Sequence, residues 1–203
     1  MQFLAPLLGG AYLPFSSASM RPAALAVVAN DIVLHDRKRL LECGSGISTI
    51  VLGRLLAARG GRVVSVEHDA GWVRVVRRLV AEHGLEATVT LVEAPLAPAP
   101  VGTLDWYDLD VVSEAVAGYS HDLLLVDGPS AWMPGHELAR LPAVPVLAEY
   151  AADSYTVVLD DADRPGEREI LKLWERDPGV QCNLYSNQGV AVGHVGGATF
   201  GLV

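Results

Sequence analysis

Short runs of aliphatic and β-branched residues alternate with longer amphipathic stretches along most of the chain. The runs occupy Arg39 to Cys43, Arg62 to Glu67, Thr88 to Val92, Asp122 to Val126, Thr156 to Leu159, and two more near Val180 to Tyr185 and Gly189 to Val195. Such alternation predicts an α/β fold, in which a mostly parallel sheet of six or seven strands carries helices on both faces. The run at 122–126 is the most hydrophobic, which predicts a central strand buried on both sides. The last two runs, separated by Ser186-Asn187-Gln188, predict an antiparallel hairpin.

The amphipathic stretches between these runs predict the helices. We expect helices over about Ser19 to His35, Ser48 to Arg59, Leu109 to Ala117 and Pro165 to Glu175, one that Asp69 caps, and one that ends at about Ala152. In the helix after Asp69, the spacing places Trp72, Val75, Val76 and Leu79 on one face. The stretch from Pro95 to Pro100 is short and is expected to form a loop.

Length, composition and charge narrow the classes of protein. A chain of 203 residues, 51% hydrophobic and 19% charged, predicts one folded domain over residues 1–203, with residues 1–37 as a helical cap segment. A net charge of −9 argues against nucleic acid and anionic membranes as partners and favours a small molecule. Two distant cysteines, and no run of about 20 apolar residues, are typical of a cytoplasmic protein.

Acidic and glycine-rich motifs follow the predicted strands, at the sheet edge where ligands bind in such folds. The first is Glu42-Cys43-Gly44-Ser45-Gly46-Ile47-Ser48-Thr49, whose glycines allow close approach of the backbone to a ligand. Glu67, 23 residues after Gly44, is placed to accept hydrogen bonds from ribose hydroxyls. Thr49 replaces the third glycine of a dinucleotide motif, and the Glu42 carboxylate repels a diphosphate. Both features argue against a nicotinamide-dependent oxidoreductase and favour a ligand with ribose and an ammonium group.

The motifs LLECGSGIST, VVSVEHD, LLLVDGP and VVLDDADR, between about Leu40 and Val192, resemble the strand-end motifs of class I S-adenosylmethionine-dependent methyltransferases. The resemblance implies a Rossmann-like, seven-stranded, mostly parallel sheet with an antiparallel C-terminal hairpin strand. It implies that Glu42, Gly44 to Gly46 and the following Ser48 contact the methionine moiety of this cofactor. It also implies that Glu67 contacts the ribose and that Asp127 lies at the sulfonium. The residues that it implies at the adenine are His68, Glu93 and Ala94.

Within that family, the spacing most resembles small-molecule O-methyltransferases of the catechol type, in which acids after two central strands hold a divalent cation. The resemblance implies that Asp127, Asp160 and Asp161 hold Mg²⁺, which would lower the pKa of an acceptor hydroxyl. Two aspartates stand where the catechol type has aspartate and asparagine, and no lysine follows Asp127. The alternative is that no metal binds, that Asp161 or Asp163 caps the next helix and pairs with Arg164 or Arg168, and that His136 is the general base.

The sequence therefore predicts a methyltransferase that transfers a methyl group from S-adenosylmethionine to an oxygen, or else a nitrogen, of a small-molecule acceptor, with Asp127, His136 and Asp161 as candidate catalytic residues. The alternative is a non-catalytic module or regulatory partner with the same cofactor pocket, and a homodimer is left open. Candidates for the acceptor pocket are the segment Tyr12 to Arg21 and two aromatic pairs, Trp106-Tyr107 and Trp132-Met133. Arg140 either lines the same cleft or lies in solvent.

Overall fold

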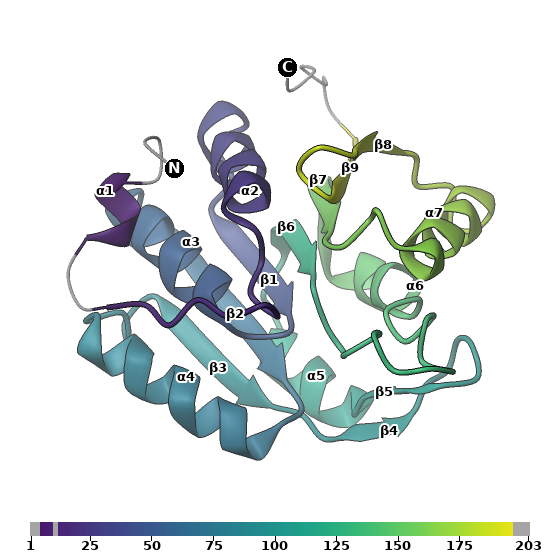
Figure 1. The fold of residues 1–203 in the computed structure, drawn as a ribbon, viewed down its shortest axis with the longest axis horizontal. Helices are drawn as coiled ribbons and strands as arrows, with labels where there is room; N and C mark the ends of the chain where they lie inside the picture. The colour runs from purple at the N-terminus through teal and green to yellow at the C-terminus, as the bar shows by residue number, and fades with distance from the viewer. Residues whose placement is uncertain (1–4, 10–11, 197–203) are drawn as a thin grey trace.

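A computed structural model describes residues 5–9 and 12–196; the remaining positions, which include part of the apolar N-terminus and of the predicted cap segment, lie outside the described residues. Seven strands form one sheet in the order β3-β2-β1-β6-β7-β9-β8, and Figure 1 shows how they are arranged. The strands are β1 (Arg39–Cys43), β2 (Arg62–Glu67), β3 (Val89–Glu93), β6 (His121–Val126), β7 (Ala151–Leu159), β8 (Cys182–Tyr185) and β9 (Val190–Val195). β9 pairs antiparallel with both of its neighbours, and the remaining pairs in this sheet are parallel. The predicted fold class is confirmed.

Helices cover both faces of the sheet (Figure 1). On one face lie α2 (Pro22–Leu34), α3 (Ile47–Ala58) and α4 (Ala70–Glu82), and on the other lie α5 (Leu109–Val116), α6 (Ala143–Leu147) and α7 (Pro165–Arg176). Successive residues of a central strand serve opposite faces: Leu123 packs with the first set of helices and Leu124 with the second. This double burial explains why the central strands are continuous apolar runs. Two shorter helical segments, α1 (Ala5–Leu8) and the 3-10 turn Ala148–Tyr150, complete the described helices.

Asp69 caps α4 as predicted, because its side chain accepts a hydrogen bond of 2.8 Å from the backbone N–H of Trp72. Trp72, at the start of the predicted apolar face of this helix, is 37% exposed. The residues of α4 that the structure buries are Val73, Val76, Leu79 and Val80. The helix therefore turns Trp72 away from the core and towards the end of the sheet.

Two segments differ from the prediction. The helix expected to end near Ala152 is confined to α6 and one 3-10 turn, and β7 already begins at Ala151, where it pairs with His121 across a register shift. The segment expected to be a loop around Pro95 to Pro100 contains β4 (Leu96–Pro98), which pairs antiparallel with β5 (Asp105–Tyr107). Burial of the two aromatic side chains of β5 holds this small hairpin against the core.

The strand order places the ligand site. β1 lies between β2 and β6. After β2 the sheet continues to β3 on one side of β1, and after β6 it continues to β7 on the other side. In such sheets, a crevice opens at the carboxyl ends of the strands where the order reverses. In Figure 1 the segment before α2 crosses this edge. Among the described residues, no helix is both long and apolar enough to span a bilayer.

Candidate active site

A cavity of about 350 Å³ lies at the carboxyl ends of β1, β2 and β6. This volume falls within the range of small-molecule binding sites. Four segments and three single residues form its wall, namely residues 18–20, 44–48, 67–69 and 127–130 with Ser16, Trp72 and Tyr107. The structure thus brings together most of the predicted cofactor residues: Gly44, Ser45, Gly46, Ser48, Glu67, His68 and Asp127.

Gly44 allows the loops after β1 and β6 to touch. Its φ angle is +89°, and a Cβ atom there would lie 2.8 Å from the backbone nitrogen of Gly128. A Cβ atom on Gly128 would in turn meet the backbone of Gly44 and the hydroxyl of Tyr107. Gly46 differs, because a Cβ atom there has open space while the residue lines the cavity. Gly44 is therefore required by the fold, whereas the absence of a side chain at Gly46 leaves room for a ligand.

Glu42 lies beneath the glycine loop. It is fully buried, and its Oε2 accepts hydrogen bonds from the hydroxyls of Thr49 at 2.5 Å and Ser65 at 2.6 Å. The Thr49 hydroxyl also accepts from the backbone N–H of Gly46 at 2.9 Å. Burial raises the pKa of Glu42 above its usual value. Glu42 is not among the described residues that line the cavity, so its contact with a methionine moiety stays a prediction.

Glu67 presents an ordered carboxylate at the cavity wall. Its Oε1 accepts from the backbone N–H groups of His68 at 2.8 Å and Asp69 at 2.9 Å, and its Oε2 accepts from that of Ser45 at 3.1 Å. The His68 Nδ1 lies 3.0 Å from Oε1. Burial acts to raise the pKa of Glu67, but the hydrogen bonds from His68, Asp69 and Ser45 outweigh it and hold the pKa below its usual value. Glu67 is therefore a charged acceptor, as ribose hydroxyls require.

Trp72 is a cavity residue that the sequence analysis missed. Its indole Nε1 donates a hydrogen bond of 2.8 Å to the backbone oxygen of Ser45, which fixes the ring beside the glycine loop. The signal available in the sequence was its position one turn after the Glu67-His68-Asp69 strand end, where the first turn of a helix faces the ligand edge. A broad aromatic surface at this point suits a flat heterocycle.

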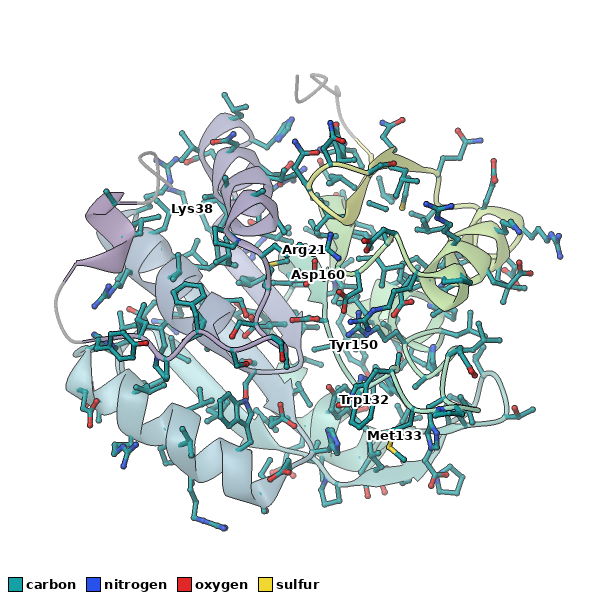
Figure 2. All side chains as sticks on the ribbon, in the orientation of Figure 1. Arg21, Lys38, Trp132, Met133, Tyr150 and Asp160 are labelled. Atoms are coloured by element: carbon teal, nitrogen blue, oxygen red, sulfur yellow. The ribbon has the colours of Figure 1, made fainter. Side chains whose placement is uncertain are left out.

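The two aromatic pairs proposed for the acceptor pocket have different positions. Tyr107 is only 1% exposed and lines the cavity, and its hydroxyl has no hydrogen-bond partner among the described residues. Burial raises the pKa of Tyr107 well above its usual value, so the hydroxyl remains a donor. Trp106 is buried in the core. Trp132 and Met133 are exposed, and Figure 2 shows both on the irregular segment between β6 and α6.

Three other predicted residues lie away from the cavity wall. Glu93 is exposed at the end of β3, and Ala94 is buried, with its backbone N–H donating to the oxygen of Glu67 at 2.8 Å. His136 is exposed in the segment after β6. The described residues that line the cavity include none of the three. Their roles at the adenine and as general base stay predictions without support from the geometry.

The segment before α2 forms the remaining wall of the cavity through Ser16, Ala18, Ser19 and Met20. Arg21 anchors the end of this segment, because its guanidinium donates to both carboxylate oxygens of Asp163 at 2.9 Å. Figure 2 shows Arg21 near Asp160 in the middle of the view, where α2 begins opposite the end of β7. Arg21 is therefore engaged with the protein itself in this structure, and a role of this segment in binding the acceptor stays a prediction.

Asp127, Asp160 and Asp161 form a cluster at the ends of β6 and β7, with ligand atoms that lie within 4.8 Å of one another. Burial raises the pKa of Asp127 well above its usual range, and burial together with Asp161 raises that of Asp160 to about 6. Asp161, with a φ of +56°, pairs with Arg164 at 2.9 Å. The alternative pairing with Arg164 is confirmed. The predicted cap is wrong, because α7 is preceded by Arg164 without a side-chain cap.

Arg140 lies inside this cluster, contrary to the expectation that it lines the cleft or lies in solvent. It is 3% exposed. Its guanidinium contacts Asp127 at 3.2 Å and Asp161 at 3.4 Å. The remaining nitrogens donate to the backbone oxygens of Pro129 at 3.3 Å and Asp160 at 3.1 Å, and one lies 3.5 Å from Glu167. Burial acts to lower the pKa of Arg140, but Asp127 and Asp161 hold it above its usual value, so the guanidinium stays charged.

The three aspartates carry the oxygen ligands that Mg²⁺ prefers. The arrangement of Arg140 does not fit a bound Mg²⁺, because its positive charge is buried in contact with two of the three carboxylates. A dication held by the same oxygens would meet this charge at close range, where little water screens the repulsion. No chemical step is therefore assigned to a metal.

A seven-stranded sheet of this order, with a cavity at the ends of β1 and β6, is the fold of the class I methyltransferases. Residues 41–162 match a protein family described as a methyltransferase domain, and the chain belongs to this family. No curated protein sequence matches the chain.

Several solved structures resemble this one. An O-methyltransferase from Bacillus cereus in complex with SAH has a TM-score of 0.62 at 17% identity, covering 95% of this chain and 87% of the other. The O-methyltransferase TomG from Streptomyces achromogenes, in complex with SAM and involved in tomaymycin synthesis, has a TM-score of 0.63 at 16% identity, covering 97% and 95%. The SAH-bound methyltransferase PaMTH1 from Podospora anserina has a TM-score of 0.64 at 14% identity, covering 94% and 100%. At these identities the likeness shows a shared fold.

Proposed function

We propose that the protein transfers a methyl group from S-adenosylmethionine to an oxygen of a small-molecule acceptor. The observation that carries this proposal is the single cavity in which the glycine loop after β1, the Glu67 carboxylate after β2 and Asp127 after β6 meet. Membership of the methyltransferase family supports the reaction type. Support for an oxygen acceptor comes from the B. cereus and S. achromogenes proteins of the same fold, which are both O-methyltransferases.

Different residues of the cavity bind different parts of the cofactor and position the acceptor. Glu67 accepts hydrogen bonds from the ribose, Trp72 and His68 flank the adenine, and the backbone of Gly44 to Gly46 lies along the methionine moiety. When bound, S-adenosylmethionine supplies a methyl group on a sulfonium sulfur; transfer breaks the sulfur–methyl bond, forms an oxygen–methyl bond and releases one proton from the acceptor hydroxyl. Asp127 is the carboxyl group at the β6 end of the cavity, and we assign its ionised form to receive this proton, since the raised pKa makes that form a stronger base.

Binding of the cofactor to Glu67 gives the first test. Replacement of Glu67 by Ala removes a charged acceptor, and hydrogen bonds of this kind contribute about 1.5–3 kcal/mol each, so we expect S-adenosylmethionine to bind about 10- to 100-fold more weakly or more. Isothermal titration with S-adenosylmethionine and with its demethylated product measures the change. Glu82→Ala is the matched control, because Glu82 is an exposed carboxylate at the far end of α4 and its loss changes the net charge equally.

Each outcome of this titration has a defined meaning. Binding to the parent chain that Glu67→Ala weakens and Glu82→Ala preserves supports the cofactor site. A screen of hydroxylated and aminated small molecules with radiolabelled methyl donor then tests transfer, with label recovered on oxygen as the expected result. Cofactor binding without transfer to any acceptor would instead favour the non-catalytic module, and no binding of either ligand would refute the proposal.

The Tyr107 hydroxyl gives a second prediction. Because this buried hydroxyl has no partner among the described residues and lines the cavity, we expect it to donate to the bound cofactor or acceptor. Tyr107→Phe should lower the affinity for that ligand about tenfold and leave the free energy of unfolding unchanged or slightly higher. Titration calorimetry and urea unfolding measure the two quantities.

Tyr119→Phe provides the opposite case. The Tyr119 hydroxyl donates to the backbone oxygens of Leu40 and Arg62, both at 3.0 Å, near the amino ends of β1 and β2. Its loss should lower the free energy of unfolding by about 1 kcal/mol and leave ligand affinity unchanged. Equal affinities of the parent and Tyr107→Phe for cofactor and acceptor would contradict the role given to Tyr107.

A further inference from the structure

We propose that the guanidinium of Arg140 takes the place of a divalent cation among Asp127, Asp160 and Asp161, and that methyl transfer in this protein is therefore independent of metal. The inference concerns the same site and rests on the proposed function only for its statement about transfer. Its structural part, that a built-in cation occupies the carboxylate cluster, stands on the geometry of the described residues alone. Arg140 acts through Asp127 and is a positioning residue.

The contacts of Arg140 are those of a structural cation with several ligands. One nitrogen of the guanidinium lies between two carboxylates, 3.2 Å from Asp127 Oδ1 and 3.4 Å from Asp161 Oδ2. The other two donate to the backbone oxygens of Pro129 and Asp160 at 3.3 Å and 3.1 Å. A single side chain thereby joins the loop after β6 to the loop after β7, as a metal ion held by acids after both strands would do.

Burial makes this arrangement selective against a metal. Arg140 is 3% exposed, and its contact with Glu167 on α7, at 3.5 Å, fixes the far side of the guanidinium. If the side chain moved into solvent to make room for an ion, the buried Glu167 carboxylate would lose this partner. Arginine keeps its charge at all physiological pH values, so the repulsion of a dication is permanent.

The position of Arg140 also determines how Asp127 is presented. Asp127 lines the cavity while Arg140 does not belong to the described wall, so the guanidinium holds Asp127 from behind. A carboxyl group held in this way keeps one orientation towards the acceptor, because the guanidinium fixes its Oδ1 at 3.2 Å. The proton of the acceptor then passes to a protein carboxylate, and no metal is needed to lower the pKa of the hydroxyl.

The test measures whether removal of the guanidinium creates a metal site. Mn²⁺ binding is followed by electron paramagnetic resonance in the parent chain, in Arg140→Met, which keeps the volume and loses the charge, and in Arg140→Lys, which keeps the charge. We expect no stoichiometric Mn²⁺ site in the parent or in Arg140→Lys. In Arg140→Met we expect one site, whose affinity for Mn²⁺ is at least tenfold higher than any residual affinity of the parent. Adding Asp160→Asn to Arg140→Met should abolish that site.

Arg164→Met is the matched control. Arg164 pairs with Asp161 at 2.9 Å but is 39% exposed, so solvent already screens its charge and its loss should change Mn²⁺ affinity less than the loss of Arg140. One tightly bound Mn²⁺ per parent chain would overturn the proposal, as would equal affinities of Arg140→Met and the parent. If Arg140→Met fails to fold, the parent and Arg140→Lys decide the question, since a metal site in either refutes it. These measurements need neither cofactor nor acceptor, so their outcome is separate from that of the titration at Glu67; methyl transfer unchanged by EDTA completes the test.

Discussion

Gly44→Ala is expected to abolish binding of S-adenosylmethionine and to lower the free energy of unfolding by about 2–5 kcal/mol. Two effects add. The residue has a φ of +89°, a left-handed conformation that costs a non-glycine residue about 1–2 kcal/mol. The new Cβ atom would also lie 2.8 Å from the backbone nitrogen of Gly128, and overpacking of this kind costs about 1–3 kcal/mol. Relief of the contact must separate the two loops that carry the cavity.

Two glycine variants separate these effects. Gly60→Ala has a similar φ of +70° but open space around the new Cβ atom, so it should lose only about 1–2 kcal/mol and keep cofactor affinity. In Gly46→Ala the new Cβ atom contacts no neighbouring atom but lies in the cavity wall, so the variant should keep the fold and bind the cofactor more weakly. Urea unfolding and titration calorimetry on the three variants provide the measurement. Equal losses of stability in Gly44→Ala and Gly60→Ala would show that contact between the loops does not matter.

The close approach of Gly44 to Gly128 changes the meaning of the glycine motif. The sequence predicted that glycine there serves a ligand, because a backbone without side chain permits close contact. In the structure, Gly44 first serves the contact with the loop after β6, and Gly46 is the position left open towards the cavity. The motif therefore combines a folding requirement with a binding requirement two residues apart.

The parts of the fold that the sequence predicts well are those set by local pattern. β1 and β2 have the predicted bounds, because buried apolar runs there begin at a charged residue and end at an acidic or glycine-rich turn. The cavity residues Gly44, Glu67 and Asp127 were also predictable. Parallel strands end at one edge of the sheet, so residues that directly follow them meet there whatever the details of packing.

The residues that the sequence did not place correctly depend on tertiary packing. Glu42 lies in the predicted strand, but tertiary packing decides that its side chain points into the protein and supports the loop from beneath instead of lining the cavity. Arg140 lies in an irregular segment without periodicity, where nothing in the sequence distinguishes a buried guanidinium from a solvated one. The hairpin that contains Tyr107 forms because its aromatic side chains find a place in the core. Such positions are decided by partners distant in sequence, which local pattern does not contain.

Asp31→Ala is expected to have the largest effect on stability outside the cavity. Asp31 is fully buried on α2, and its Oδ1 accepts from His194 Nε2 of β9 at 3.0 Å and lies 2.9 Å from His35 Nδ1. Arg37 Nε lies 3.7 Å from the other oxygen. Removal of one partner from a buried group of charges costs about 3–5 kcal/mol, because the other partners stay buried. The variant should also bind the cofactor more weakly, since α2 directly follows the segment whose Met20 lines the cavity.

Asp36→Ala is the control, and pH distinguishes the mechanism. Asp36 pairs with Lys38 at 2.9 Å and Arg59 at 2.8 Å but is exposed, so solvent screens both pairs and its loss should lower the free energy of unfolding far less than the loss of Asp31. Burial acts to raise the pKa of Asp31, but the hydrogen bond from His194 and the charge of His35 hold it below its usual value. A lowered pKa stabilises the fold above the unfolded value of about 3.9, and the effect is lost as pH falls through the folded pKa. The stability difference between parent and Asp31→Ala in urea unfolding should therefore persist down to about pH 4 and shrink below it; a difference that grows with acidity would contradict the role given to the Asp31 carboxylate.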